Sequence, residues 1–127
     1  MAPEVSVVVP TFNRIDTLPE VLDALARQEG APSFEVIVVD DGSTDDTARW
    51  LAARPADDLP LRTLRQENRG PAAARNAGVA VARGEWVAFL GDGIVPEKGH
   101  PLAPRHRDSR VARRRRTTVL LTQRSQR

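Results

Sequence analysis

The sequence predicts an α/β fold in which a parallel β-sheet carries helices on both of its faces. Short runs of apolar, mostly β-branched residues, typical of strands that are buried on both faces, recur between residues 5 and 90. Segments with apolar residues at three- and four-residue spacing, typical of amphipathic helices, lie between these runs. The regular alternation of the two patterns, with short connections, indicates repeated β-α-β units.

Two strands and two helices are expected in the first half of this region. Residues Val5–Val9 predict the first strand, and we expect Pro10 to end it because proline has no backbone N–H for the ladder. Apolar residues on one face predict a helix from about Asp16 to Gln28. Phe34–Val39 predicts a second strand, and a helix from about Asp45 to Ala53 follows it.

The pattern repeats in the second half. Leu61–Leu64 alternates apolar and polar residues, which predicts a short third strand. Pro71 suits the first turn of a helix that continues from Ala72 to Val81. Trp86–Leu90 predicts a fourth buried strand. We therefore expect a sheet of about four parallel strands.

The sign of the net charge changes near residue 97. Residues 1–97 contain nine Arg, no Lys and sixteen acidic residues, a net charge of −7, whereas residues 98–127 contain ten basic residues and one acidic residue, a net charge of +9. Because this end has no helical periodicity, we expect a disordered basic tail. One alternative is a patch for nucleic acid or anionic lipid, which lacks aromatic residues or an amphipathic helix to support it. Another alternative is that residues 98–127 derive from a shifted reading frame.

The composition excludes several kinds of site. Cysteine is absent, which excludes disulfides, thiolate metal sites and a cysteine nucleophile. No apolar stretch approaches the roughly 18 residues that suggest a membrane span, and the N-terminus lacks the basic leader of a signal peptide. We therefore expect a location in the cytoplasm, or peripheral to a membrane.

Carboxylates follow two of the predicted strands. Asp40 and Asp41 come directly after the second strand, and Asp92 follows the fourth. Ligands gather at the carboxyl ends of strands in open α/β sheets, where carboxylates accept hydrogen bonds or hold a divalent cation beside phosphate. This favours a nucleotide-phosphate site. The alternative is that Asp40, Asp41, Gly42 and Ser43 form only a turn and a helix cap.

Four segments of the chain form a recognisable series. They are residues 5–14 (VSVVVPTFNR), 36–45 (VIVVDDGSTD), 68–78 (NRGPAAARNAG) and 84–93 (GEWVAFLGDG). Together they resemble the consecutive signatures of glycosyltransferase family two in order and spacing, over residues 4–97. The resemblance implies a Rossmann-like GT-A nucleotide-diphospho-sugar transferase fold, here truncated to its donor-binding region, with residues 98–127 outside the family pattern.

The resemblance implies residues that contact the nucleotide base. In the family the loop after the first strand contacts the base, which implies Pro10, Thr11 and Phe12. The ring of Phe12 is available for stacking, and a position in the core is an equal alternative. The second carboxylate of the pair reads the base edge, which implies Asp41, with Asp40 supporting the loop.

Two further positions concern the phosphates and a metal. Arg75 matches a family position near the nucleotide phosphates or base, the alternative being a solvated side chain. Asp92 matches the family's Asp-x-Asp type motif, which binds the ribose and a divalent metal, manganese or magnesium. Gly93 stands where the family carries a further carboxylate, so we expect a lower metal affinity unless Asp92 takes over.

The resemblance also implies a function. It is the transfer of a sugar from a nucleotide-diphospho-sugar to an unknown acceptor, in the synthesis of cell-surface or extracellular polysaccharide or glycoconjugate. Inverting members take their general base from a later half of the domain that has no counterpart here, so the catalytic residue stays unassigned. The alternative is an inactive nucleotide-binding fragment of such an enzyme. We expect no nucleic-acid partner, no transmembrane segment, and self-association through an exposed sheet edge.

Overall fold

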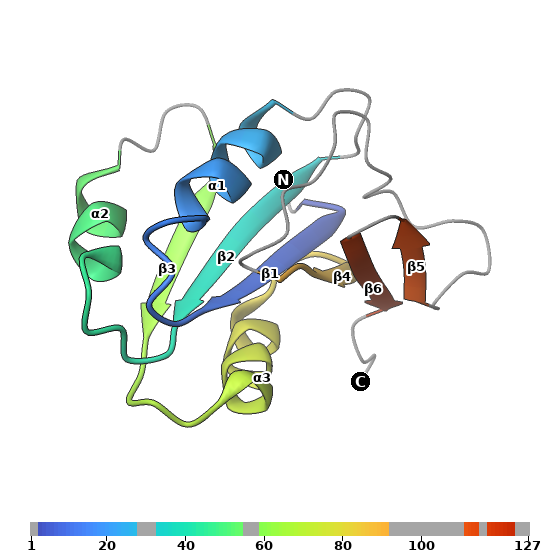
Figure 1. The fold of residues 1–127 in the computed structure, drawn as a ribbon. Helices are drawn as coiled ribbons and strands as arrows, with labels where there is room; N and C mark the ends of the chain where they lie inside the picture. Colours follow the sequence, from blue (N-terminus) through green and yellow to red (C-terminus); the bar gives the residue numbers. More distant parts are fainter. Residues whose placement is uncertain (1–2, 28–32, 55–58, 92–110, 115–116, 124–127) are drawn as a thin grey trace.

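The structure is a computed structural model that describes residues 3–27, 33–54, 59–91, 111–114 and 117–123, the last two ranges by their backbone. Within these ranges the strands form one sheet in the order β3-β2-β1-β4-β6-β5, and helices pack against it (Figure 1). In chain order the elements are β1 (Val5–Thr11), α1 (Leu18–Ala26), β2 (Phe34–Asp40), α2 (Thr47–Ala53), β3 (Leu61–Arg65), α3 (Pro71–Val81), β4 (Trp86–Phe89), β5 (Val111–Arg114) and β6 (Thr117–Gln123).

The predicted arrangement of four parallel strands is confirmed. β1 pairs in parallel with β2 on one side and with β4 on the other, and β3 pairs in parallel with β2. The two helices that follow β1 and β2 begin later than predicted. Thr17, not Asp16, is the N-cap of α1. Asp45 precedes α2 because its carboxylate accepts a hydrogen bond from the backbone N–H of Thr47 at 2.9 Å.

Pro10 lies inside β1, and the prediction that it ends the strand was wrong. Val8 and Pro10 turn their backbone groups to the same side, since alternate residues of a strand do so. That side faces β4, because the carbonyl of Val8 accepts the N–H of Leu90 at 3.0 Å. The pairing of β1 with β4 ends at Val8, before Pro10 is reached. On the other side pairing with β2 continues to Thr11, whose carbonyl accepts the N–H of Asp41 at 2.9 Å. The N–H that proline lacks is therefore not needed for the pairing with β2.

Helices cover both faces of the sheet, as predicted. Alternate residues of β1 and β2 point to opposite faces, where two separate apolar cores form. The core under α1 and α2 contains Val5, Val7, Val9, Leu18, Val21, Leu22, Leu25, Val36, Val38, Leu51, Leu59, Ala88 and Leu90. The core under α3 contains Val8, Ile37, Val39, Ala74, Ala82 and Val87. The central strands are thus apolar on both sides, which explains their continuous apolar sequences.

Two segments of the predicted tail form strands. β6 pairs antiparallel with β4, with Leu121 opposite Ala88 and Leu120 opposite Phe89, and β5 pairs antiparallel with β6. In these segments the structure differs from the expected disorder, because the outer edge of β4 offers backbone groups for pairing and residues 117–121 are threonine, valine and leucine. Residues 98–110, 115–116 and 124–127 lie outside the described residues. The division of the chain at residue 97 stays a prediction.

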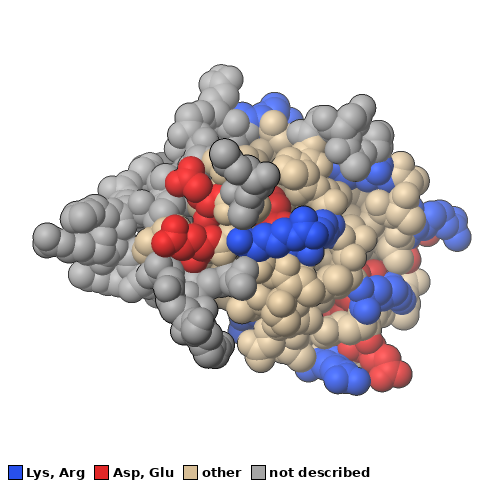
Figure 2. All heavy atoms as spheres, turned by 180° about the vertical axis from the view of Figure 1, so that it is seen from behind, with Lys and Arg blue, Asp and Glu red and all other residues tan. Residues whose placement is uncertain are grey.

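Charged side chains of both signs are scattered over one face of the described surface (Figure 2). On the face opposite to the view of Figure 1, basic and acidic side chains lie interspersed among uncharged ones (Figure 2). The described helices are all too short or too polar to cross a membrane.

A buried polar cluster ties the turn before β4 to the sheet. The carboxylate of Glu35 accepts hydrogen bonds from Ser6 Oγ at 2.6 Å, from the backbone N–H of Arg83 at 2.8 Å, and from the guanidinium of Arg62 at 2.9 and 3.1 Å. Ser6 Oγ in turn accepts the backbone N–H of Gly84 at 2.8 Å. Burial alone would raise the pKa of Glu35, but these hydrogen bonds outweigh it and lower the pKa below its ordinary value.

Replacing Glu35 by glutamine is expected to lower the free energy of unfolding at neutral pH by about 1.5 kcal/mol, because an amide cannot accept all of these hydrogen bonds. Because the pKa of Glu35 is lower in the folded state, Glu35 stabilises the fold at pH values above its unfolded pKa of about 4.3. This contribution is lost as the pH falls through the pKa of the folded state. The variant should therefore lose less stability than the wild type between about pH 6 and pH 3. Urea denaturation at both pH values measures this difference. Glu67→Gln is the control, because the side chain of Glu67 is 90% exposed. The prediction would be contradicted if Glu35→Gln and the wild type lost the same stability between the two pH values.

Candidate functional site

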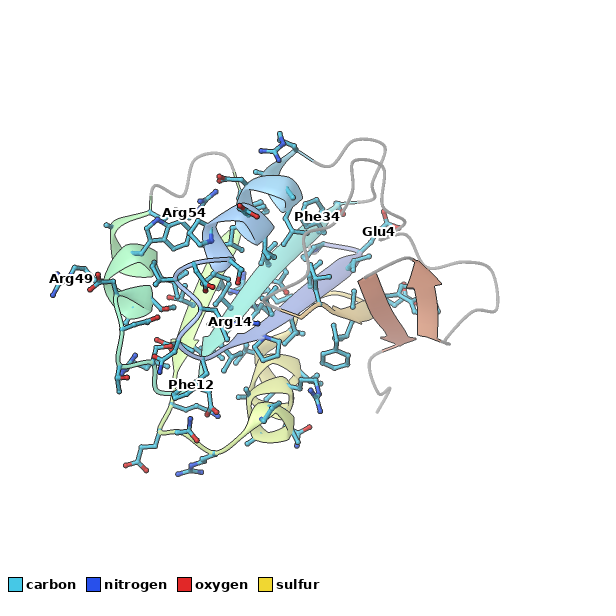
Figure 3. The ribbon with its side chains drawn as sticks, viewed as in Figure 1. Glu4, Phe12, Arg14, Phe34, Arg49 and Arg54 are labelled. Atoms are coloured by element: carbon cyan, nitrogen blue, oxygen red, sulfur yellow. The ribbon has the colours of Figure 1, made fainter. Side chains whose placement is uncertain are left out.

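A cavity of about 420 Å³ opens at the carboxyl ends of β1 and β2, beside the first turns of α3. Its size lies in the usual range of small-molecule sites, about 300 to 1,000 Å³. Two segments that are far apart in sequence, residues 10–14 and 68–75, form most of its wall. Figure 3 labels Phe12 and Arg14, which come from the loop that follows β1. The lining residues are Pro10, Thr11, Phe12, Arg14, Asp41, Asn68, Gly70, Pro71, Ala74, Arg75 and Gly91.

Asp40 and Asp41 have different roles although they are adjacent. Asp40 ends β2 and is buried, and Arg65 Nη1 donates to its Oδ2 at 2.6 Å. Its other oxygen, Oδ1, accepts the backbone N–H of Ser43 at 2.9 Å. Asp40 therefore holds the loop after β2 and does not line the cavity. These contacts agree with the turn part of the alternative role, but the helix-cap part is wrong because Asp46 is the N-cap of α2.

Asp41 lines the cavity and also anchors the start of α3. Its Oδ1 accepts the side-chain amide of Gln66 at 2.9 Å and the backbone N–H of Arg69 at 2.8 Å, and its Oδ2 accepts the backbone N–H of Gly70 at 2.9 Å. Burial alone would raise the pKa of Asp41, but these hydrogen bonds outweigh it and lower the pKa below its ordinary value. A carboxylate accepts about four hydrogen bonds, so Asp41 keeps capacity for a donor from a ligand.

The side chains at the end of β1 supply an aromatic ring and a hydroxyl. Phe12 is 43% exposed and lines the cavity, so the alternative of a core position is wrong. Thr11 is buried, and its Oγ1 has no hydrogen-bond partner among the described residues. Such a buried hydroxyl is stabilised when a ligand or water supplies the missing partner.

Two arginines give the cavity a positive charge. Arg75 lines it from α3, is half-buried, and forms no ion pair within the described part of the chain. Arg14 lines it from the loop after β1, and its Nη1 lies 4.0 Å from Asp16 Oδ2 at the surface. Guanidinium groups suit phosphate oxygens because they are always charged and donate in a fixed plane. The cavity can therefore bind an anionic ligand that also has a flat apolar part.

Most of the predicted site residues meet at this cavity. The structure brings together Pro10, Thr11, Phe12, Asp41 and Arg75. It places Asp40 behind the loop, and Asp92 lies outside the described residues.

Sequence reasoning missed six lining residues. They are Arg14, Asn68, Gly70, Pro71, Ala74 and Gly91. The signal for them was present, because all six fall inside the quoted segments 5–14, 68–78 and 84–93.

The metal site predicted at Asp92 cannot be built from the described residues alone. They contain no group of three His, Cys, Asp or Glu side chains placed to hold an ion. Asp41 is a poor substitute because three N–H donors already point at its oxygens. Gly93, like Asp92, lies outside the described residues.

Comparison with known proteins gives one consistent result. The model of the family described as "Glycosyl transferase family 2" matches residues 6–100. The chain is also similar to the succinoglycan biosynthesis protein ExoO of Rhizobium meliloti (strain 1021), with 42% identity over 98 residues, which are 76% of this chain and 28% of ExoO.

Solved structures resemble the fold described above. The chain aligns with S. aureus TarS 1–349 in complex with UDP-GlcNAc at a TM-score of 0.68 and 36% identity, over 75% of this chain and 28% of the TarS 1–349 chain. It aligns with the mannosyltransferase PcManGT from Pyrobaculum calidifontis, in complex with GDP-Man and Mn²⁺, at a TM-score of 0.66 and 34% identity, over 78% of this chain and 30% of that protein. The matched region thus covers between 28% and 30% of ExoO, of the TarS 1–349 chain and of the PcManGT chain.

Proposed function

Because the chain belongs to glycosyl transferase family 2, we propose that it binds the nucleotide-diphospho-sugar donor of a glycosyl transfer reaction. The cavity at the ends of β1 and β2 is the observation that carries this proposal. Two structural relatives, one with UDP-GlcNAc and one with GDP-Man, support a donor of this class. The name of ExoO, a succinoglycan biosynthesis protein, supports a role in glycan synthesis, and we propose a cell-surface or extracellular polysaccharide or glycoconjugate as the product. The acceptor is not assigned.

The cavity offers a complementary group for each part of such a donor. The exposed ring of Phe12 suits stacking on a base, and Asp41 suits an imide or amino donor on the base edge. Arg14 and Arg75 suit the negative charge of the diphosphate. In this proposal Pro10 and Thr11 form the floor beside the base, and Asp40 acts indirectly by holding the loop.

A divalent metal is a further part of the proposal. We assign Asp92 as its carboxylate ligand on the basis of the sequence motif, with Gly93 able to supply only a carbonyl. The Mn²⁺ bound to the relative PcManGT supports a metal of this type. When bound, the ion would neutralise charge on the leaving diphosphate.

The location of the protein and its self-association are also proposals. We place the protein in the cytoplasm or at the surface of a membrane, in keeping with the absence of a membrane-spanning helix from the described residues. Self-association is proposed through the outer strands of the sheet. Since β4 pairs with β6, the strands β3 and β5 form the edges of the described sheet.

Calorimetric titration of the 127-residue chain with UDP, GDP and dTDP, each with Mn²⁺ and with EDTA, tests the donor site. We expect at least one of them to bind with a dissociation constant on the order of 10 to 100 μM, since a nucleotide is a small ligand with one stacked ring and one charged tail. The corresponding nucleosides are the control and should bind more weakly because they lack the diphosphate. A folded sample that binds none of the three would refute the proposal. Release of sugar from a nucleotide-sugar would in addition exclude the alternative of an inactive fragment.

A further inference from the structure

Asn13 has an unusual backbone conformation between two residues of the cavity wall. Its φ is 52°, in the left-handed region that residues other than glycine rarely adopt, and asparagine tolerates it better than most. Phe12 and Arg14 on either side line the cavity, whereas Asn13 does not. A rare conformation of this kind persists only where the surrounding contacts hold it in place.

The contacts that hold Asn13 come from the loop after β2, about thirty residues later. Asn13 Oδ1 accepts the backbone N–H groups of Thr44 at 2.7 Å and Asp45 at 3.1 Å. Its own backbone N–H donates to Ser43 Oγ at 2.8 Å. A weaker contact joins Asn13 Nδ2 to Thr44 Oγ1 at 3.3 Å. Asp45 Oδ2 also accepts the N–H of Ile15 at 3.4 Å. The loop of residues 12–15 is therefore fastened to residues 43–45 mainly through one side chain.

The second loop is itself fixed to the sheet. Asp40 Oδ1 accepts the N–H of Ser43 at 2.9 Å, and Arg65 Nη2 donates to the carbonyl of Ser43 at 2.9 Å. Asp40 and Arg65 lie opposite each other in the paired strands β2 and β3. A continuous series of hydrogen bonds thus runs from the sheet through Ser43 to Asn13.

We propose that Asn13 is a positioning residue for the nucleotide site, which holds Phe12 and Arg14 in place before the ligand arrives. The inference rests on the proposed function, because it concerns the same cavity. Without Asn13 the loop would have to become ordered when the nucleotide binds, and this ordering lowers affinity. Asn13 would then affect binding although it makes no contact with the ligand.

Three variants separate this role from a general effect on folding. Asn13→Gly keeps the left-handed conformation but removes the side-chain hydrogen bonds, and we expect it to bind the nucleotide about tenfold more weakly. Asn13→Asp keeps an oxygen that accepts the N–H groups of Thr44 and Asp45, and should bind within about threefold of the wild type. Thr44→Val removes only the two weak hydroxyl contacts, from Asn13 Nδ2 at 3.3 Å and to Asn13 Oδ1 at 3.4 Å, and should bind within about twofold of the wild type. All three should show the cooperative melting of the wild type.

Titration with the nucleotide that binds the wild type, together with hydrogen exchange without ligand, gives the readout. In Asn13→Gly the amides of residues 12–15 should exchange faster while those of β1 and β2 keep their protection. Wild-type affinity in Asn13→Gly, an equal loss in Asn13→Asp, or unchanged exchange at residues 12–15 would each overturn the positioning role. A wild type that binds none of the nucleotides would instead refute the proposed function, and the positioning role with it.

Discussion

Replacing Asp41 by asparagine is expected to weaken nucleotide binding by about 100-fold, equivalent to roughly 2.7 kcal/mol, because a charged acceptor at the cavity wall is lost. The amide of asparagine would also direct its NH₂ group toward N–H donors. Asp41 accepts hydrogen bonds from Gln66, Arg69 and Gly70, so one of these three would be left without its acceptor. The start of α3, which forms another wall of the cavity, would shift as a result.

The same titration measures the effect of Asp41→Asn. Asp46→Asn is a matched control, because this aspartate lies on the same loop with a side chain that is 75% exposed and outside the cavity. The pKa of Asp41 is lowered, so the carboxylate is ionised at neutral pH and the difference from wild type should be constant between about pH 6 and pH 8. Wild-type affinity in a folded Asp41→Asn variant would remove Asp41 from the site.

Replacing Gly84 by alanine is expected to lower the free energy of unfolding by about 3 kcal/mol, at the upper end of what overpacking costs. A Cβ at this position would lie 2.7 Å from the backbone N of Ser6 and 2.8 Å from the carbonyl carbon of Val5. Both atoms belong to the backbone of the central strand β1, so neither can move aside as a flexible side chain does. The hydrogen bond from Gly84 to Ser6 Oγ would be strained as well.

Urea denaturation of Gly84→Ala at neutral pH measures this loss. Arg83→Ala is the control in the same turn, because Arg83 is exposed and its contact with Glu35 uses the backbone N–H. It should change the stability by no more than about 0.5 kcal/mol. A loss below about 1 kcal/mol in Gly84→Ala would mean that the turn before β4 relaxes away from β1 without much cost.

The parallel sheet could be predicted because its signal is local. Continuous apolar runs such as Val36–Val39 follow from burial on both faces, and the predicted strands agree with the observed ones to within two residues. The error at Pro10 arose because the sequence does not say which neighbour a backbone N–H would face. The strands after residue 110 were missed because their pairing with β4 depends on an edge that exists only in the folded sheet.

The site could be predicted only in part. Carboxylates at the end of β2 indicated its place, and the family resemblance favoured Asp41 over Asp40, in agreement with the lining of the cavity. The anchoring of α3 by Asp41 was beyond the sequence, because its donors lie more than twenty residues further along the chain. The hydrogen bonds of Asn13 to residues 43–45 were missed for the same reason, since these partners follow a different strand.

Pro10 has a consequence for the shape of the sheet as a whole. The connections from β1 lead outward through β2 to β3 on one side, whereas β4 lies on the other side, so the order reverses between β1 and β4. Such a reversal is a topological switch point, where the two neighbouring chains diverge and a crevice forms. Pro10 has no N–H to donate to the carbonyl of Leu90, and the pairing of β1 with β4 ends before it, at Val8. Pro10, the residue of β1 without a backbone N–H, therefore lies beyond the last paired residues of β1 and β4 and in the wall of the cavity.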